Sequence, residues 1–193
     1  SICDNGATSG HPVIKTRMDL QTSGADIRFR QTQATSSASS LVMTGWPGAG
    51  YSTGVWHHLV TTSTSTSSAA GTISLFFNTV AKGSTTGNTF TDTTPTLDYD
   101  LVIGQSMQYD AHRHEFEGLI DEVTIWSKEL SSDDIDTLYN SGVPADATES
   151  GISNLIHYYR CGDKLSGTSM PDQVGSNDMT LVNGVGTSSD VPS

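Results

Sequence analysis

Residues Gly118–Gly142, GLIDEVTIWSKELSSDDIDTLYNSG, form the stretch that decides the fold. The stretch begins inside a run, Phe116–Trp126, in which Ile, Val and Trp are interspersed with polar residues. Such a run is typical of a β-strand. In the second half of Gly118–Gly142 the apolar residues have helical spacing, which predicts a helix. The stretch as a whole therefore predicts a strand followed by a short helix.

The helix signals are local and agree with one another. Ser131 followed by Asp134 three positions later resembles a capping box, with Asp in place of the usual Glu. An apolar stripe with helical spacing follows; it consists of Ile135, Leu138 and Tyr139. We expect Gly142 to cap the end of the helix and Pro144 to prevent its continuation.

The rest of the chain contains short β-type runs between turn residues, and helical periods are almost absent. The expected strands are Val13–Met18, Asp26–Gln31, Ser40–Thr44, Val55–Thr62, Gly71–Asn78, Asp100–Gln105, Leu155–Cys161 and Asp178–Val182. Val55–Thr62 and Gly71–Asn78 enclose a Ser/Thr-rich loop, which predicts a long hairpin. The sequence therefore predicts an all-β protein with one short α-helix.

Composition limits the partners. Nine Lys and Arg residues against 21 Asp and Glu residues give a net charge of −12, which disfavours nucleic acid and anionic membranes. No run of about 18 apolar residues predicts a membrane span. The chain begins at Ser1 without a signal peptide, so we expect a mature product or a fragment.

Four pieces of sequence occur in the order expected for one family. They are VWHHLV (Val55–Val60), GTISLFFN (Gly71–Asn78), LVIGQ (Leu101–Gln105) and the stretch Gly118–Gly142. Together they resemble laminin G-like and pentraxin-type domains of the concanavalin A-like lectin/glucanase superfamily, although Thr79 stands where the family has Gly. The resemblance implies a jelly-roll sandwich of two antiparallel sheets in one domain, 1–193. The family's opening strand is absent, which implies a fragment lacking it.

The tail Tyr158–Gly184 resembles the ends of such domains in phage and viral structural proteins. The resemblance rests on Asp163, Asp172, Gly175 and the strand Asn177–Leu181. It implies a location on a virion or another extracellular surface. Fold-level likeness does not by itself establish a function.

The resemblance also implies a calcium site. Pentraxin-like domains place an Asp-Asn pair before an early strand and further oxygen donors after the I-G-Q strand, and calcium prefers such oxygen ligands. Asp4, Asn5 and Asp110 match these positions, with Gln108 as a further candidate. The family's Glu-Gln-Asp run is Ser-Met-Gln here, so one carboxylate is missing. The alternative is that Asp4 and Asn5 only form a tight turn with Gly6.

Candidate sugar-binding residues are aromatic side chains in loops, because sugars stack their C–H faces on rings. Trp46, Tyr51 and Tyr109 lie in glycine-rich or polar segments. Trp46 precedes a Pro-Gly turn and alternatively only fills that loop. Trp56 and Trp126 are expected in strands, as core or sheet-face residues.

No catalytic residues are predicted. Asp121 and Glu122 are neighbours in an expected strand and would face opposite sides, so we interpret Asp121 as a buried residue bonded to backbone. Glu115 and Glu117 share a face, but the E-x-D-x-x-E motif of glucanases of this fold is absent. Cys3 and Cys161 are either a disulfide near the two chain ends or two unlinked thiols.

These observations favour a non-enzymatic, lectin-like glycan-binding or adhesion module, assisted by Ca²⁺. A purely architectural virion or fibre domain is the first alternative, and a glycoside hydrolase is the second. The expected partners are surface glycans or neighbouring structural subunits, including further copies of the chain.

Overall fold

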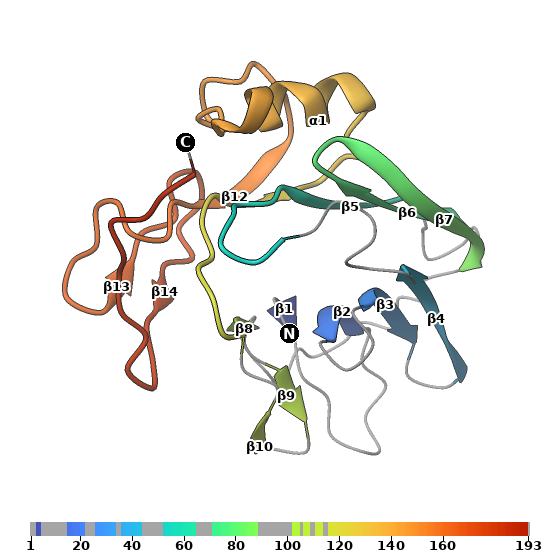
Figure 1. The fold of residues 1–193 in the computed structure, drawn as a ribbon, viewed down its shortest axis with the longest axis horizontal. Coiled ribbons are helices and arrows are strands. Elements are labelled where there is room, and N and C mark those ends of the chain that lie inside the picture. The colour runs from blue at the N-terminus through green and yellow to red at the C-terminus, as the bar shows by residue number, and fades with distance from the viewer. Residues whose placement is uncertain are drawn as a thin grey trace. The chain divides into compact units, whose positions relative to one another are not determined.

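The structure is a computed structural model (Figure 1) and describes residues 3–4, 15–21, 26–33, 36–43, 52–64, 71–88, 102–104, 106–108, 111–113 and 116–192. The chain divides into two compact units. Unit 1 comprises Ser1–Val55 and Leu59–Glu117, and unit 2 comprises Trp56–His58 and Gly118–Ser193. The prediction of one domain over 1–193 stays a prediction.

Unit 1 contains a five-stranded antiparallel sheet in the order β4-β3-β2-β1-β8. Its strands are β1 (Cys3–Asp4), β2 (Lys15–Gln21), β3 (Asp26–Gln33), β4 (Ser36–Met43) and β8 (Val102–Ile103). Four of them coincide with predicted strands, with shifted ends. A separate pair follows in the sequence, β9 (Ser106–Gln108) with β10 (Ala111–Arg113).

The second sheet of unit 1 has the order β5-β6-β7 and is antiparallel (Figure 1). Its strands are β5 (Leu59–Ser63), β6 (Gly71–Phe77) and β7 (Val80–Asn88), so the predicted hairpin is confirmed. Ile73 and Leu75 are fully buried on one face, and Val60 is buried on the other. The sheet therefore buries side chains on both of its faces.

The turn between β6 and β7 has only two central residues. Phe77 pairs with Val80, and Asn78 and Thr79 have φ values of 44° and 68°. Two positive φ values are what a type I′ hairpin turn requires, and Asn-Gly is its preferred sequence. Thr79 therefore adopts a left-handed conformation that is unfavourable for a β-branched residue.

Unit 2 holds the helix. Helix α1 (Ser132–Tyr139) begins after Ser131, whose Oγ accepts the Asp134 backbone N–H at 3.2 Å while Asp134 Oδ2 accepts the Ser131 N–H at 2.9 Å. The predicted capping box is thus confirmed, and Ile135 and Leu138 are buried as expected. None of the described helices has the length and apolar character needed to cross a membrane.

The end of the helix differs from the prediction. Asn140, with φ 43° and ψ 48°, is the C-cap, and the short 3-10 turn η1 (Asn140–Gly142) follows it. Gly142 lies at the end of that turn with φ 100°. Asn tolerates the left-handed conformation through its short polar side chain, so the helix ends before the glycine is reached.

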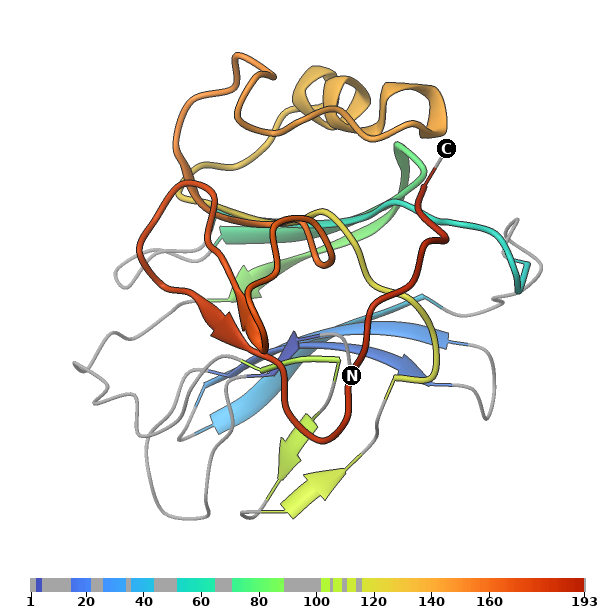
Figure 2. The ribbon, with the colours of Figure 1, turned by 90° about the vertical axis from the view of Figure 1, so that its left-hand side faces the viewer.

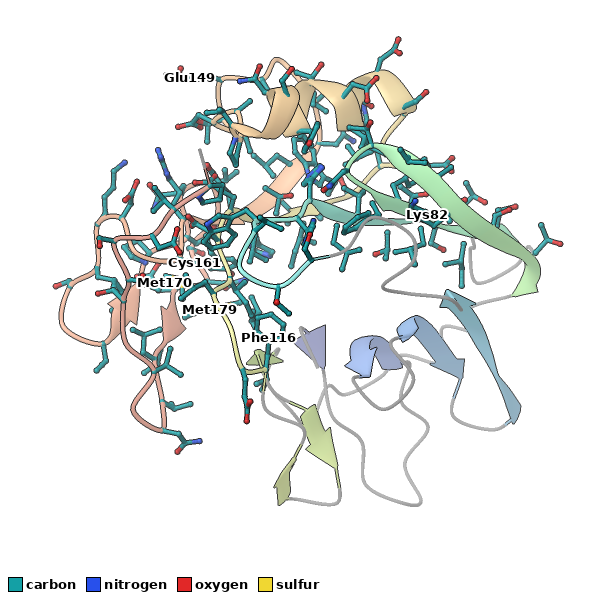
Figure 3. All side chains as sticks on the ribbon, viewed as in Figure 1. Lys82, Phe116, Glu149, Cys161, Met170 and Met179 are labelled. Carbon is teal, nitrogen blue, oxygen red and sulfur yellow. The ribbon has the colours of Figure 1, made fainter. Side chains whose placement is uncertain are left out.

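Two small antiparallel sheets complete unit 2. Strand β11 (Val123–Trp126) pairs with β12 (Leu155–Tyr159), and β13 (Ser169–Met170) pairs with β14 (Met179–Thr180). Figure 2 shows β13 beside β14, and Figure 3 labels their paired residues Met170 and Met179. The all-β, antiparallel fold class with a short α-helix is therefore confirmed.

Candidate functional site

The predicted calcium ligands come from unit 1. Asp4 ends β1 and pairs with Val102 of β8, while Gln108 ends β9. Only the backbone of these two ligands is described, and Asn5 and Asp110 lie outside the described residues. Among the side chains that are described, no group of three or more His, Cys, Asp or Glu residues is arranged to hold a metal ion. Calcium binding stays a prediction.

The aromatic residues predicted to contact sugar, Trp46, Tyr51 and Tyr109, also lie outside the described residues. Of the other two tryptophans, Trp126 lies in β11 as predicted. Trp56 does not lie in a strand, because β5 begins only at Leu59. Trp56 is half-buried and its Nε1 donates to Asp190 Oδ1 at 3.2 Å.

Asp121 and Glu122 do not lie in a strand either. Strand β11 begins at Val123, and Glu122 has a left-handed φ of 53°. The predicted alternation of these two side chains across a strand is therefore wrong. Asp121 is half-buried, and its Oδ1 accepts the Glu122 backbone N–H at 2.9 Å, in agreement with a structural role bonded to backbone.

Glu122 belongs to a network that we call the Arg160 cluster: Glu122, Asp146, Tyr158, Arg160 and Asp163. The Tyr158 hydroxyl donates to Glu122 Oε2, and Arg160 Nε lies 3.5 Å from Glu122 Oε1. Arg160 Nη1 lies 3.2 Å from Asp146 Oδ2, and Nη2 lies 3.0 Å from Asp163 Oδ2. One guanidinium thus holds three carboxylates from three segments of unit 2.

Burial governs the titration of the groups in and beside this cluster. It raises the pKa of Glu122, although the hydrogen bond from Tyr158 partly opposes the rise. It also raises the pKa of Asp121, of the Tyr158 hydroxyl, and of the Cys161 thiol, the last to about 12. Cys161 is a free thiol, as in the unlinked alternative, and at neutral pH it is protonated and a poor nucleophile.

A second polar centre, the Asp172 centre, lies beside β12. The Asp172 carboxylate is fully buried; its Oδ1 accepts backbone N–H groups of Tyr158 at 3.1 Å and Val174 at 3.2 Å. Its Oδ2 lies 2.6 Å from His157 Nδ1. Although burial opposes ionisation, the backbone N–H of Gly175 and the bonds to His157, Tyr158 and Val174 lower the pKa of Asp172 well below its usual value.

The Asp172 centre supplies hydrogen-bonding partners for the backbone of β12 at Tyr158. Besides the Asp172 bond to the Tyr158 N–H, the Gln173 N–H donates to the Tyr158 carbonyl oxygen at 2.8 Å. A Cβ on Gly175 would lie 2.4 Å from Asp172 Oδ2 and 2.8 Å from His157 Nδ1, so only glycine fits there. His157 and Arg160 were missed, because His157 pairs with Asp172, 15 positions away, and two of the three carboxylates around Arg160 are 14 and 38 positions away.

Comparison with known proteins decides the family. Residues 4–136 match the profile of a family described as the concanavalin A-like lectin/glucanases superfamily. The chain belongs to this superfamily. The predicted resemblance is thereby confirmed over most of the chain. A search of curated proteins found no match.

One solved structure that resembles the chain is a crystal structure of an S-layer domain-containing protein, residues 221–444, from Clostridium thermocellum. The two are 24% identical, with a TM-score of 0.38. The match covers 68% of this chain and 58% of that chain.

The name of the superfamily covers both lectins, which bind carbohydrate, and glucanases, which hydrolyse it. Retaining hydrolysis of a glycosidic bond needs two accessible carboxyl groups about 5–5.5 Å apart. In unit 2, Glu122 and Asp172 are bonded to neighbouring side chains and backbone, and Asp121 accepts a backbone N–H. These carboxyl groups act as structural ties.

Proposed function

We propose that this chain is a non-enzymatic, lectin-like module that binds surface glycans or mediates adhesion, and that it acts on a phage or viral fibre or another extracellular structure. The observation that carries the proposal is its membership of the concanavalin A-like lectin/glucanases superfamily over residues 4–136. In this fold the loops at the sheet edges are free to differ while the sheets supply the scaffold.

The hydrogen bonds of Glu122 and Asp172 in unit 2 support binding over hydrolysis at these two carboxyl groups. A general acid needs a carboxyl group that can reach the substrate and exchange a proton. The Asp172 carboxylate is fully buried and takes part in several hydrogen bonds, and Glu122 is held by Tyr158 and Arg160. These bonds would have to break before either group could do chemistry.

The proposed binding site lies in unit 1. Trp46, Tyr51 and Tyr109 supply aromatic faces, and Asp4, Asn5, Gln108 and Asp110 supply oxygen ligands for Ca²⁺. The pairing of β1 with β8 supports this grouping, because it sets Asp4 beside the strand that leads into β9. The net charge of −12 favours neutral glycans over sulfated or uronic-acid glycans.

A glycan array with the purified chain, with and without EDTA, tests the proposal. We expect binding to neutral glycans that chelation abolishes and Ca²⁺ restores, and we expect Trp46→Ala to lose it. Asp110→Asn should lower the calcium affinity, while the control Asp133→Asn changes an exposed helix carboxylate and should leave both glycan and calcium binding unchanged.

A second measurement follows the melting temperature against Ca²⁺ concentration, because an ion that binds only the folded state stabilises it by mass action. Silence across the array would overturn glycan binding and point to an architectural domain that contacts neighbouring subunits. Binding that is insensitive to EDTA, with no calcium-dependent stabilisation, would overturn the metal assignment alone. Release of reducing sugar from a bound polysaccharide would overturn the non-enzymatic assignment.

A further inference from the structure

The turn Val182–Val185 places an Asn-Gly pair on an exposed part of unit 2. Asn183 and Gly184 have φ values of 57° and 77°, and the Val185 N–H donates to the Val182 carbonyl oxygen at 3.2 Å. Both central residues are exposed, and a Cβ on Gly184 would meet nothing within 4 Å. Within the described part of the chain, the Asn183 side-chain amide takes part in no hydrogen bond. The amide is therefore free to react.

We propose that Asn183 is a site of spontaneous deamidation. The Gly184 backbone nitrogen attacks Asn183 Cγ, a new N–Cγ bond forms, and the Cγ–Nδ2 bond breaks. Ammonia leaves with the proton from the Gly184 amide, giving a cyclic succinimide. Water then opens the ring at Cγ to give aspartate, or at the main-chain carbonyl carbon to give isoaspartate. The net reaction consumes one water, releases one ammonia and involves no redox change.

Gly184 distinguishes this site from the other asparagines that the structure describes. Because glycine has no Cβ, its nitrogen can approach a neighbouring side chain, and its backbone reaches conformations closed to other residues. Asn154 and Asn177 are also exposed, but they precede Leu155 and Asp178. The turn must open before the succinimide ring can close. Within the turn itself, only one exposed backbone hydrogen bond opposes this opening.

Isoaspartate at position 183 would change the tail that follows. The segment before the turn is anchored by the Leu181 N–H bond to the Thr168 carbonyl oxygen at 2.8 Å. The segment after it is tied back through Asp190 to Trp56. Isoaspartate lengthens the main chain between these anchors by one methylene, whereas aspartate adds only a charge. We therefore expect isoaspartate, but not aspartate, to release Asp190 from Trp56.

Incubation of the purified chain in mildly alkaline buffer, followed by peptide mass spectrometry, tests the reaction. In the peptide that contains residue 183, we expect the mass to change by the exchange of one NH for one oxygen. We expect two products of this same mass, one with aspartate and one with isoaspartate. Asn154 and Asn177 serve as controls within the same sample and should stay unchanged. Asn183→Gln keeps the amide but disfavours the five-membered ring, so it should abolish the gain. Equal rates at Asn183 and Asn154 would overturn the proposal.

Hydrogen exchange of residues 186–192, with tryptophan fluorescence, tests the consequence. We expect the isoaspartate fraction, separated by chromatography, to match Asp190→Ala in exchange and fluorescence. Asn183→Asp should match the fresh protein, because its main chain has normal length. An isoaspartate fraction that matches the fresh protein would overturn the coupling to Trp56. These readouts involve no glycan, so they stand apart from the proposed binding function.

Discussion

At the scale of single residues, Asp172 is a buried carboxylate on which several of unit 2's polar contacts converge. Asp172→Ala leaves the buried N–H group of Tyr158 and the partly buried N–H group of Val174 without their acceptor. At about 1–3 kcal/mol for each unsatisfied group, we expect a loss of roughly 2–4 kcal/mol in the free energy of unfolding, measured by urea denaturation. Asp133→Ala removes an exposed carboxylate and should change it by less than about 0.5 kcal/mol.

The pH dependence separates lost charge from lost packing. The folded-state pKa of Asp172 lies below its ordinary value of 3.8, so its stabilisation is fully present above pH 3.8 and is lost as the pH falls further. The gap in stability between the wild type and Asp172→Ala should therefore shrink as the pH falls below 3.8. A gap that persists unchanged in acid would contradict the ionic role of Asp172.

Gly175 has no side chain, and a Cβ at its position would overlap the Asp172 centre. Gly175→Ala would place a Cβ 2.4 Å from Asp172 Oδ2, and relief of that overlap must move a buried carboxylate. We expect the free energy of unfolding to fall by roughly 1–3 kcal/mol. We also expect the NMR resonances of the His157 imidazole to shift. Gly186→Ala is the control, because a Cβ there meets nothing within 4 Å. Equal stability of the two variants would show that the Asp172 centre can accommodate a methyl group at position 175 without loss of stability.

At the scale of elements, the β6–β7 turn carries a correctable strain. Thr79 has a φ of 68°, and a left-handed conformation costs a residue with a Cβ roughly 1–2 kcal/mol. Thr79→Gly should therefore stabilise unit 1 by about 1 kcal/mol, measured by thermal or urea unfolding. Thr86→Gly, within β7, should destabilise it instead, because glycine weakens a strand. Destabilisation by Thr79→Gly would mean that the Thr79 side chain makes contacts worth more than the strain.

The same elements show what the sequence could and could not predict. The β5–β6 hairpin and helix α1 were predictable because their signals are local: strand alternation, a capping box and an apolar stripe. The strand predicted at Phe116–Trp126 shrank to Val123–Trp126, because Glu122 turns left-handed to meet Tyr158 and Arg160. Those partners lie 36 and 38 positions away, and no local period reports them. Trp46 and Asp110 were singled out from resemblance and loop chemistry alone.

At the scale of the whole molecule, the negative charge is unevenly divided. Unit 2 holds twelve of the 21 Asp and Glu residues but three of the nine Lys and Arg residues, so it carries −9 of the net −12. Part of that charge is neutralised within the Arg160 cluster. Glu129, Asp133, Asp136 and Glu149 remain exposed and repel one another through solvent. This repulsion destabilises the folded state, and salt screens it.

We therefore expect the melting temperature to rise as NaCl is added from low ionic strength to about 0.15 M, where the Debye length is about 8 Å. The triple variant Asp133→Asn, Asp136→Asn, Glu149→Gln should melt higher at low salt and respond less to NaCl. CaCl₂ at matched ionic strength separates screening from binding, because screening alone gives equal curves and a specific site adds stabilisation that saturates. A melting temperature that falls with NaCl would show that the ion pairs of Arg160 outweigh the repulsion among the exposed carboxylates.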